Sequence, residues 1–358
     1  MAGKALATFQ DWVKATNERV LTPPKDIISD AVNRTYALAD ALRGRGEDEV
    51  VQSGASITDR LQLISGSQFG FYDPNEQFTP VIEDTLTKIQ CPWRFAKDLW
   101  AWTDHEIKLN GGDRLIQWKN LRDSKRQASH VSLYNGLEAA IWATPNQNTM
   151  ESLTATGGRP YSILAFIAEN GIQPSGWTTT IQQVDPTANP RWQNQVSNFA
   201  AAQLDTTLVS GMENLWRLVK FESPETKEDY FRETKFRKMK IYTNLDGWRT
   251  AVRLLRQSND RNYPTNDLGY ATEDPVFGRI PIKWVEALEA QSYAIGQPRY
   301  FYVNYEYLFP VYHAERYMYE TDPINGGHMQ PYSWVVYKDV WYNWFCRSRW
   351  RQGILVPV

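Results

Sequence analysis

A long hairpin pattern followed by a long helix pattern constrains the fold of this sequence more than any other feature. Between residues 57 and 95, two limbs carry apolar residues at alternate positions, and Tyr72-Asp73-Pro74-Asn75 predicts the turn between them. Arg94 is expected on one face of the return limb, and the other face is predicted to carry Ile89, Cys91, Trp93 and Phe95. Each limb exceeds the usual strand length of about 3–10 residues, and an isolated ribbon of this reach cannot bury its apolar face. We therefore expect a flap that lies on a second copy of the chain.

The helix pattern runs from Gly112 to Ala143 without a proline, and Pro145 ends it. At 1.5 Å per residue it would form a rod of about 45 Å. A chain that contains a long rod and a long flap is typical of proteins that tile or bind one another rather than enclose a pocket.

The composition of the chain argues against several classes of function. The 358 residues include 39 Lys and Arg and 41 Asp and Glu, and a net charge of −2 calls for neither nucleic acid nor an anionic membrane as a partner. No apolar run approaches the length of a membrane-spanning helix, and the first residues lack the apolar core of a signal peptide, so we expect synthesis in a cytosol. Cys91 and Cys346 are expected to be small buried hydrophobic residues, because two distant cysteines make neither a disulfide framework nor a metal motif.

Aromatic residues are abundant, with 15 Trp, 19 Tyr and 14 Phe, and they are densest between Tyr300 and Trp350. An aromatic-rich β surface is either a sugar-binding platform or a sheet core and subunit interface, and the arginines interleaved here favour the second interpretation. On a strand, Arg347, Arg349 and Arg351 would share one face. That strip predicts a charged edge strand, a contact with a neighbouring subunit or a contact with phosphate.

The sequence carries no signature of catalysis. The four histidines stand singly, and His105-Glu106 lacks the second ligand of a zinc-protease motif because Leu109 occupies its position. Phosphate-binding loops and nucleophile elbows are also absent from the sequence. We therefore predict no catalytic centre, no metal and no cofactor. A glycosidase needs only two carboxylates, so an aromatic-rich glycan-binding protein or glycosidase stays open as an alternative.

The remaining segments have simpler patterns. Residues 1–53 are predicted to form a loosely attached arm, so that removal of residues 1–45 would leave the rest folded. A span rich in Gly, Pro and Thr follows the rod and precedes an α/β pattern. Helices are predicted over 163–169, 198–222 and 245–257, the last capped by Asn244, and strands over 238–243, 280–285 and 300–308. Residues 333–347, rich in Val, Tyr and Trp, are predicted to form either a pair of strands or one long bent strand.

This order of arm, extended hairpin, long spine helix, loop-rich α/β domain and final strand resembles tailed-phage major capsid proteins of the Hong Kong 97 type. The resemblance covers most of residues 54–356. The stretches that carry it in their wording are Gly54–Leu61, Pro92–Phe95, Trp102–Asn110, Asp274–Pro281 and Tyr342–Arg347.

The resemblance implies an α+β fold of the Hong Kong 97 type with five parts. These parts are the N-terminal arm (1–53), the extended β-hairpin loop with peripheral-domain strands (54–103), the spine helix of the peripheral domain (104–145), the axial domain with peripheral segments (146–330) and the C-terminal strands of the peripheral domain (331–358).

The implied function is structural. Copies made in the host bacterial cytoplasm would form hexamers and pentamers, which close into the icosahedral shell of the virion around double-stranded DNA. That DNA would be enclosed without sequence-specific binding, and the implied partners are other copies of the chain with portal, scaffold or decoration proteins. Encapsulins share the fold but enclose cargo proteins, and they stay open as a second alternative.

The candidate interface residues combine both lines of reasoning. Four aromatic residues crowd the predicted flap tip, where an isolated hairpin would leave them in water. The full set is Phe69, Phe71, Tyr72, Phe78, Trp93, Arg347, Arg349 and Arg351.

Overall fold

The fold was obtained as a computed structural model, and its described residues fall into two compact units. Unit 1 includes Phe95–Ala139 and Tyr312–Tyr342, and unit 2 includes Thr35–Arg94, Ala140–Val311 and Asn343–Val358. The residues that the structure describes are 37, 41, 50–51, 54–62, 71, 86–109, 114–152, 157–178, 180–201, 204–220, 239–258, 275–278, 280–291, 297–326 and 332–358.

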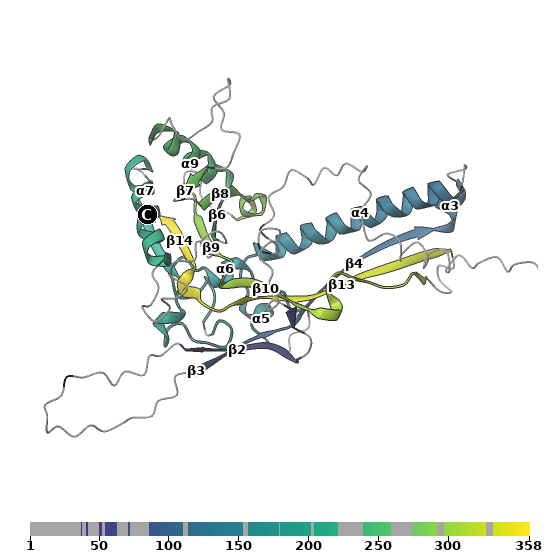
Figure 1. The fold of residues 1–358 in the computed structure, drawn as a ribbon, viewed down its shortest axis with the longest axis horizontal. Coiled ribbons are helices and arrows are strands. Elements are labelled where there is room, and N and C mark those ends of the chain that lie inside the picture. Colours follow the sequence, from purple (N-terminus) through teal and green to yellow (C-terminus); the bar gives the residue numbers. More distant parts are fainter. Residues whose placement is uncertain are drawn as a thin grey trace, which may run out of the picture. The chain divides into compact units, whose positions relative to one another are not determined.

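Unit 1 combines a sheet with the long helix α4, which runs along one face of that sheet (Figure 1). Strand β13 pairs with β4, β10, β11 and β12. Four of the elements, β4, α4, β10 and β13, also contribute residues to unit 2. The elements are β4 (Arg94–Thr103), α3 (Asp104–Leu109), α4 (Arg114–Ile141), β10 (Leu308–His313), the 3₁₀ helix η7 (Ala314–Arg316), β11 (Tyr319–Glu320), β12 (Ile324–Asn325) and β13 (Ser333–Cys346).

Two predictions from the sequence are confirmed in these elements. The predicted rod is α4, whose first helical residue is Arg114, and of the two alternatives predicted over 333–347 the structure has one long strand, β13. Burial alternates along β13. Its even-numbered residues from Trp334 to Tyr342 are buried, and the odd-numbered residues between them are exposed or half-buried. The long strand therefore has one face toward the core and one face outward.

The inner face of the unit 1 sheet packs against α4. Its core is a cluster of Trp100, Trp102, Trp334 and Val336. Two polar contacts fix the helix on β4: the Ser129 hydroxyl donates to Asp98 at 2.7 Å, and the Lys125 ammonium donates to the Ala101 carbonyl at 3.1 Å.

Unit 2 contains the stem of the predicted hairpin. Strand β2 (Ser56–Gln62) pairs antiparallel with β3 (Leu86–Pro92), and the register runs from Ser56 opposite Pro92 to Gln62 opposite Leu86. Ile57, Ile89 and Cys91 are buried in the stem, as the alternation predicts. The predicted turn over 72–75 lies outside the described residues.

The alternation fails after Trp93, which belongs to neither β3 nor β4. Arg94 is buried and Phe95 is exposed, so the prediction that placed Trp93 and Phe95 on one face is wrong. The Arg94 guanidinium donates to the carbonyls of Arg159, Met150 and Ser152 at 3.1, 3.1 and 2.7 Å. These bonds compensate for burial of a charged side chain, which is costly without partners.

The rest of unit 2 is built around a mixed sheet. Its strand order is β5-β14-β9-β6-β8-β7, parallel at β14–β5 and β6–β8 and antiparallel elsewhere. The strands are β5 (Gln195–Phe199), β6 (Met239–Thr243), β7 (Val276–Phe277), β8 (Ile280–Trp284), β9 (Tyr300–Asn304) and β14 (Gly353–Pro357), with β1 (Val50–Val51) in the other sheet beside β10. The helices are α5 (Gln147–Met150), α6 (Ile163–Phe166), η3 (Pro190–Trp192), α7 (Leu204–Lys220), α9 (Leu245–Ser258), η6 (Glu286–Ala290) and η9 (Arg349–Arg351).

Helices α7 and α9 pack on the mixed sheet and form an apolar core together with its strands. Buried α7 residues recur at helical spacing, Leu208, Met212, Leu215 and Val219. Gly353 permits the close approach of α7 to β14, because a Cβ at this position would lie 2.7 Å from Leu215 Cδ1. Asn244 caps α9 as predicted, since its side-chain oxygen accepts from the Gly247 N–H at 3.0 Å.

Two predicted elements of unit 2 require correction. The helix predicted over 198–222 begins at Leu204, because residues 195–199 form β5 and pair with β14. The strand predicted over 300–308 is broken into β9 and β10 by a turn at Asn304–Tyr307. In that turn the Tyr307 N–H donates to the Asn304 carbonyl and the Glu306 N–H donates to the Asn304 side chain.

The C-terminal part of the predicted arm contributes to unit 2. Ala37 and Ala41 are helical and buried, and the Tyr305 hydroxyl donates to the Ala37 carbonyl at 3.3 Å. Removal of residues 1–45 would therefore delete these buried contacts. The expectation that the rest of the chain stays folded applies instead to a truncation that ends before residue 35.

Candidate assembly surface

The outer face of the unit 1 sheet presents large apolar side chains to solvent. Strand register places Tyr319 opposite Asp339 and Ile324 opposite Val335, so these residues share the face that points away from α4. We call this set the outer aromatic face: Phe95, Leu99, Tyr319, Ile324, Tyr337 and Trp341, of which all but the half-buried Trp341 are exposed.

Ring contacts order part of the outer aromatic face. Phe95 meets Trp341 edge-to-face at 4.9 Å between centroids. The Arg316 guanidinium lies 4.8 Å from the Tyr319 ring centre and 5.5 Å from that of Trp341. Rigid aromatic rings with an arginine between them are the residue types enriched at protein–protein interfaces.

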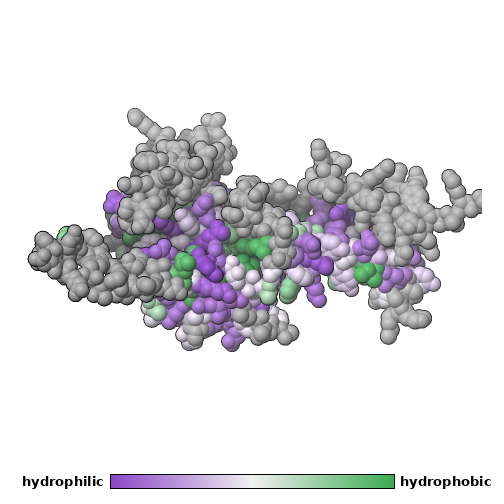
Figure 2. Space-filling model, turned by 60° about the horizontal axis from the view of Figure 1, so that its bottom comes forward, coloured by the Kyte–Doolittle hydropathy of each residue, from purple (hydrophilic) through white to green (hydrophobic). Residues whose placement is uncertain are grey.

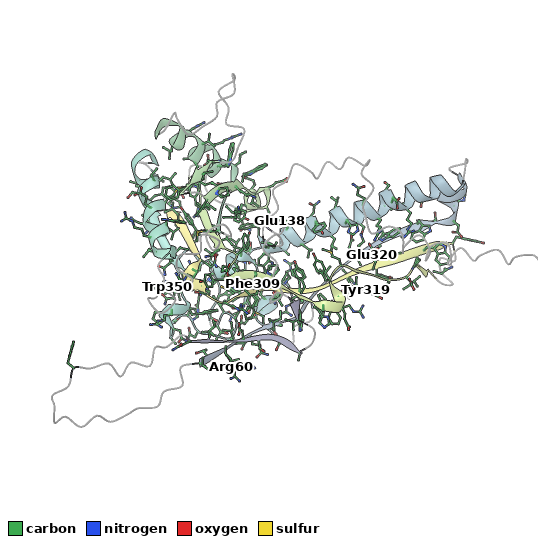
Figure 3. All side chains as sticks on the ribbon, in the orientation of Figure 1. Arg60, Glu138, Phe309, Tyr319, Glu320 and Trp350 are labelled. Atoms are coloured by element: carbon green, nitrogen blue, oxygen red, sulfur yellow. The ribbon has the colours of Figure 1, made fainter. Side chains whose placement is uncertain are left out.

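The opposite side of β11 carries charge (Figure 3). Glu320 accepts from Arg126 through both carboxylate oxygens, at 3.1 and 2.9 Å, and lies 3.3 Å from the Lys338 ammonium. Burial raises the pKa of Glu320, but the Arg126 hydrogen bond and the charges of Arg126, Lys338 and His130 lower it more, so the pKa lies below its ordinary value. This ionised carboxylate ties β11 to α4 and β13.

Burial lowers the pKa of Lys338 from 10.5 to about 8, although the nearby Glu320 charge opposes that shift. The folded chain thus binds fewer protons than the unfolded chain between these two pH values. Its free energy of unfolding should rise as the pH increases from about 8 toward 10.5.

Glu320→Gln should destabilise unit 1 by about 3–5 kcal/mol, because it leaves buried cations without their counter-charge. Lys338→Met is the matched comparison: it removes a cation whose side chain is 1% exposed but keeps the Arg126–Glu320 pair, so its loss of stability should be smaller than that of Glu320→Gln. Thermal and urea unfolding of the two variants measure the difference. Equal losses in both would contradict the importance assigned to the Glu320 charge.

The sequence-predicted residues of unit 2 lie in contrasting environments. Trp93 is buried, and its indole N–H donates to the Gly54 carbonyl at 2.8 Å. Phe71 is 94% exposed. The other flap-tip residues, Phe69, Tyr72 and Phe78, lie outside the described residues.

The three C-terminal arginines do not share a strand face, and that prediction is wrong. Residues 349–351 form the 3₁₀ helix η9, which closes with the Gln352 N–H donating to the Arg349 carbonyl. Arg347 pairs with Asp59 at 2.9 Å and lies over the Phe309 ring, while Arg351 lies over the Tyr307 ring. Both remain half-exposed.

Arg349 is fully buried and binds its own chain. Its guanidinium donates to the carbonyls of Phe166, Ile172 and Trp192 at 2.9, 3.0 and 2.7 Å, and to the Asn194 side-chain oxygen at 3.2 Å. Burial lowers the pKa of Arg349 to about 10, so the side chain is still charged at neutral pH. Arg349 thus stabilises the inside of unit 2.

Glu151 is the buried carboxylate that most resembles a catalytic group. Its oxygens accept from the hydroxyls of Tyr161 and Thr180 and from the backbone N–H groups of Gln182 and Gln183. Gln182 and Gln183 adopt positive φ angles of 54° and 66°, and the turn they form aims both N–H groups at Glu151. A carboxylate surrounded by donors of its own chain is typical of a structural anchor.

The described part of the chain gives no support for a metal site or for a membrane-spanning segment. Among these residues, no group of three or more His, Cys, Asp or Glu side chains could hold a metal ion. No described helix is both long and apolar enough to cross a membrane. On the face in Figure 2, hydrophobic residues form small groups between hydrophilic ones, an arrangement compatible with contacts between protein surfaces.

Reasoning from the sequence missed most of the outer aromatic face. The sequence patterns point to Phe95 but not to Leu99, Tyr319, Ile324, Tyr337 or Trp341. Alternation along residues 333–342 gives no signal for this face, because each side of the strand carries two aromatic residues and one charged residue.

Comparison with solved structures decides the fold. The chain resembles the subunit in "Cyanophage A-1(L) capsid asymmetric unit" with a TM-score of 0.62 and 10% identity, over 94% of this chain and 97% of that chain. The chain has a phage capsid fold. The capsid structure of cyanophage P-SCSP1u also matches, with a TM-score of 0.50 and 10% identity over 96% of this chain and 94% of that chain. No family model and no curated protein matches the sequence.

The capsid fold confirms the α+β prediction and, at the level of the fold, the resemblance to tailed-phage major capsid proteins. The long helix α4 spans the residues in which the sequence predicts a long rod, and β2 and β3 form the stem of the predicted hairpin.

Proposed function

We propose that this chain is the structural subunit of a phage capsid, in which many copies form hexamers and pentamers of a closed shell around double-stranded DNA. The observation that carries the proposal is the capsid fold shared over nearly the whole length of both chains. The virion is its place of action, and the host bacterial cytoplasm its place of synthesis.

Two surfaces of the subunit support self-association. One is the outer aromatic face of unit 1, whose exposed apolar rings would be covered by a neighbouring protein. The other is the flap that leaves the stem after Gln62 and returns at Leu86, with Phe71 exposed. We propose both as contacts between copies, with half-exposed Arg347 and Arg351 as further contacts.

The proposed roles of the segments follow the five parts that the resemblance to capsid proteins implies. We propose that residues 54–145 and 331–346 supply the peripheral domain, that residues 146–330 supply most of the axial domain together with strand β14, which pairs with β5 and β9, and that the arm contacts other copies. Portal, scaffold and decoration proteins are proposed as further partners. We also propose that the subunit has no catalytic role. Glu151 supports this proposal, because its carboxylate oxygens already accept hydrogen bonds from its own chain.

The decisive experiment is expression of the full chain, followed by gel filtration and negative-stain electron microscopy. Closed megadalton particles are the expected result. A small monomer with affinity for glycans would instead favour the glycan-binding alternative, and particles that copurify with one cargo protein would favour the encapsulin alternative. Neither alternative has support from the capsid structures named above.

Removal of residues 1–34 should leave the rest of the chain folded but impair particle formation, because unit 2 keeps Ala37 and Ala41. Circular dichroism and melting of the subunit, with electron microscopy of the product, measure the two effects. Removal of residues 1–45 is the matched comparison, and it should lower the melting temperature because the Tyr305–Ala37 contact is lost. Normal particles from the shorter truncation would remove the arm from the assembly proposal.

A further inference from the structure

The stem of the flap has an outer face that carries two cations and no carboxylate. The register of β2 and β3 places Arg60 directly opposite Lys88, and both side chains are exposed. The alternate residues Ile57, Ile89 and Cys91 are buried on the inner face. Figure 3 shows Arg60 on the side of the stem that points away from the rest of unit 2. We call three cross-strand pairs the stem face: Thr58–Gln90, Arg60–Lys88 and Gln62–Leu86.

The two cations of the stem face repel each other. Like charges directly opposite on neighbouring strands are destabilising. The adjacent carboxylate of Asp59 belongs to the other face of β2 and pairs with Arg347 at 2.9 Å. Among the residues that the structure describes, no ion pair neutralises Arg60 or Lys88. An anionic partner from outside this set would remove the repulsion.

Protection of a strand edge does not account for both cations. Charge on an edge strand discourages unwanted strand pairing, and β2 is such an edge in its two-stranded sheet. The other edge of the sheet, on β3, is already bonded at Gln90, whose N–H donates to the Gln182 carbonyl at 3.2 Å. Lys88 on β3 therefore adds a second positive charge where edge protection does not require one.

The flap between the two strands has a complementary composition. Residues 63–85 have a formal charge of −4, because they include four acidic residues and no Lys, Arg or His. The acidic residues are Asp73, Glu76, Glu83 and Asp84, and the aromatic residues among them are Phe69, Phe71, Tyr72 and Phe78. The stem face offers two cations with their aliphatic chains, together with Leu86, which is 51% exposed. Carboxylates and apolar rings would thus both find partners on it.

We propose that the acidic flap of one copy docks on the stem face of a second copy, with flap carboxylates paired to Arg60 and Lys88. The inference rests on the proposed function, which requires contacts between copies, and it names the surface that receives the flap. A second copy is favoured over the flap's own stem because Phe71, in the middle of the flap, is 94% exposed in the single chain.

Charge reversal on the full-length chain tests the docking. Arg60→Glu with Lys88→Glu makes the stem face negative, so these subunits should fold but not form particles. A flap variant with Asp73→Lys, Glu76→Lys, Glu83→Lys and Asp84→Lys should fail alone for the same reason. Co-expression of the two variants should restore particles, because each flap then meets an oppositely charged stem on the other variant. Negative-stain electron microscopy measures particles, and thermal melting measures folding.

Two exposed arginines of unit 2 provide the matched control. Arg217 on α7 and Arg253 on α9 lie away from the stem, and Arg217→Glu with Arg253→Glu changes the net charge by the same amount. This variant should form normal particles. Normal particles from the stem variant alone, equal failure of the control variant, or no restoration on co-expression would each overturn the proposal. The last result would place the contact within one chain.

Peptide binding separates the docking from the shell function if the wild-type chain forms no particles. The probe is a synthetic peptide of residues 63–85, and fluorescence anisotropy measures its affinity for the full-length chain. Arg60→Glu with Lys88→Glu should weaken this affinity by about tenfold or more. Arg60→Gln with Lys88→Gln should also weaken it, and this variant serves if the reversed one does not fold. Binding that depends on these two cations would uphold the docking without the shell, whereas binding that ignores them, or no binding, would overturn the docking.

Discussion

Alanine at both Phe69 and Phe71 is expected to prevent or sharply reduce shell formation while the isolated subunit stays folded. Phe71 is 94% exposed in the single chain, so its ring contributes little to the stability of unit 2. Burial of one such ring against a neighbour is worth roughly 1.5–3 kcal/mol, and in a shell the loss repeats in every subunit. Light scattering and negative-stain microscopy measure assembly, and circular dichroism with thermal melting measures the subunit.

Val276→Ala is the matched control for the flap variant. Val276 is an exposed apolar residue on β7, outside the flap and outside the outer aromatic face, and its truncation should leave assembly normal. Two results would contradict the proposal: an unfolded subunit, which places the two rings in an intramolecular core, or normal particles, which leave the flap tip without a role in assembly.

Arg349→Leu should cause a large loss of stability in unit 2. The substitution removes four hydrogen bonds and leaves the buried carbonyls of Phe166 and Trp192 and the half-buried carbonyl of Ile172 without this donor, whereas the Asn194 side-chain oxygen keeps the Ala168 N–H. Each unsatisfied buried group costs about 1–3 kcal/mol, so a total loss of several kcal/mol is expected. For a unit of this size that corresponds to a fall of roughly 10 °C or more in melting temperature.

Arg351→Leu tests whether the loss of one positive charge is enough to explain the loss of stability in Arg349→Leu. Arg351 lies on the same 3₁₀ helix, is half-exposed and stacks over Tyr307, so its loss should lower the melting temperature by only a few degrees or less. Similar melting temperatures for the two variants would show that the buried hydrogen bonds of Arg349 matter less than the structure indicates.

Local sequence features predicted several elements. The helix α9 with its Asn244 cap follows from the helical spacing of apolar residues, β13 from its content of Val, Tyr and Trp, and α4 from a long stretch without proline that Pro145 ends. In each of these elements one face packs on a core, so the residue pattern and the local structure agree.

Other features depend on contacts that spacing does not encode. The inversion at Arg94 and Phe95 arises because Trp93 interrupts the strand, and the partners of Arg94 lie more than fifty residues away. In the sequence, Arg349 resembles an exposed residue of a strand. In the structure, carbonyl groups from segments that are distant in the sequence surround it. Residues 198–199 have helical spacing in the sequence but join a parallel pair with β14.

Arg94 and Arg349 hold unit 2 together through neutral oxygen atoms, and this choice of partner affects how the protein responds to its solution. Dissolved salt screens attraction between exposed opposite charges, but it has little effect on a buried guanidinium bound to backbone dipoles. Protonation of a carboxylate likewise cannot break bonds to carbonyls. Changes of ionic strength or moderate acidity should therefore leave these two anchors intact, while they act on the ion pairs around Glu320.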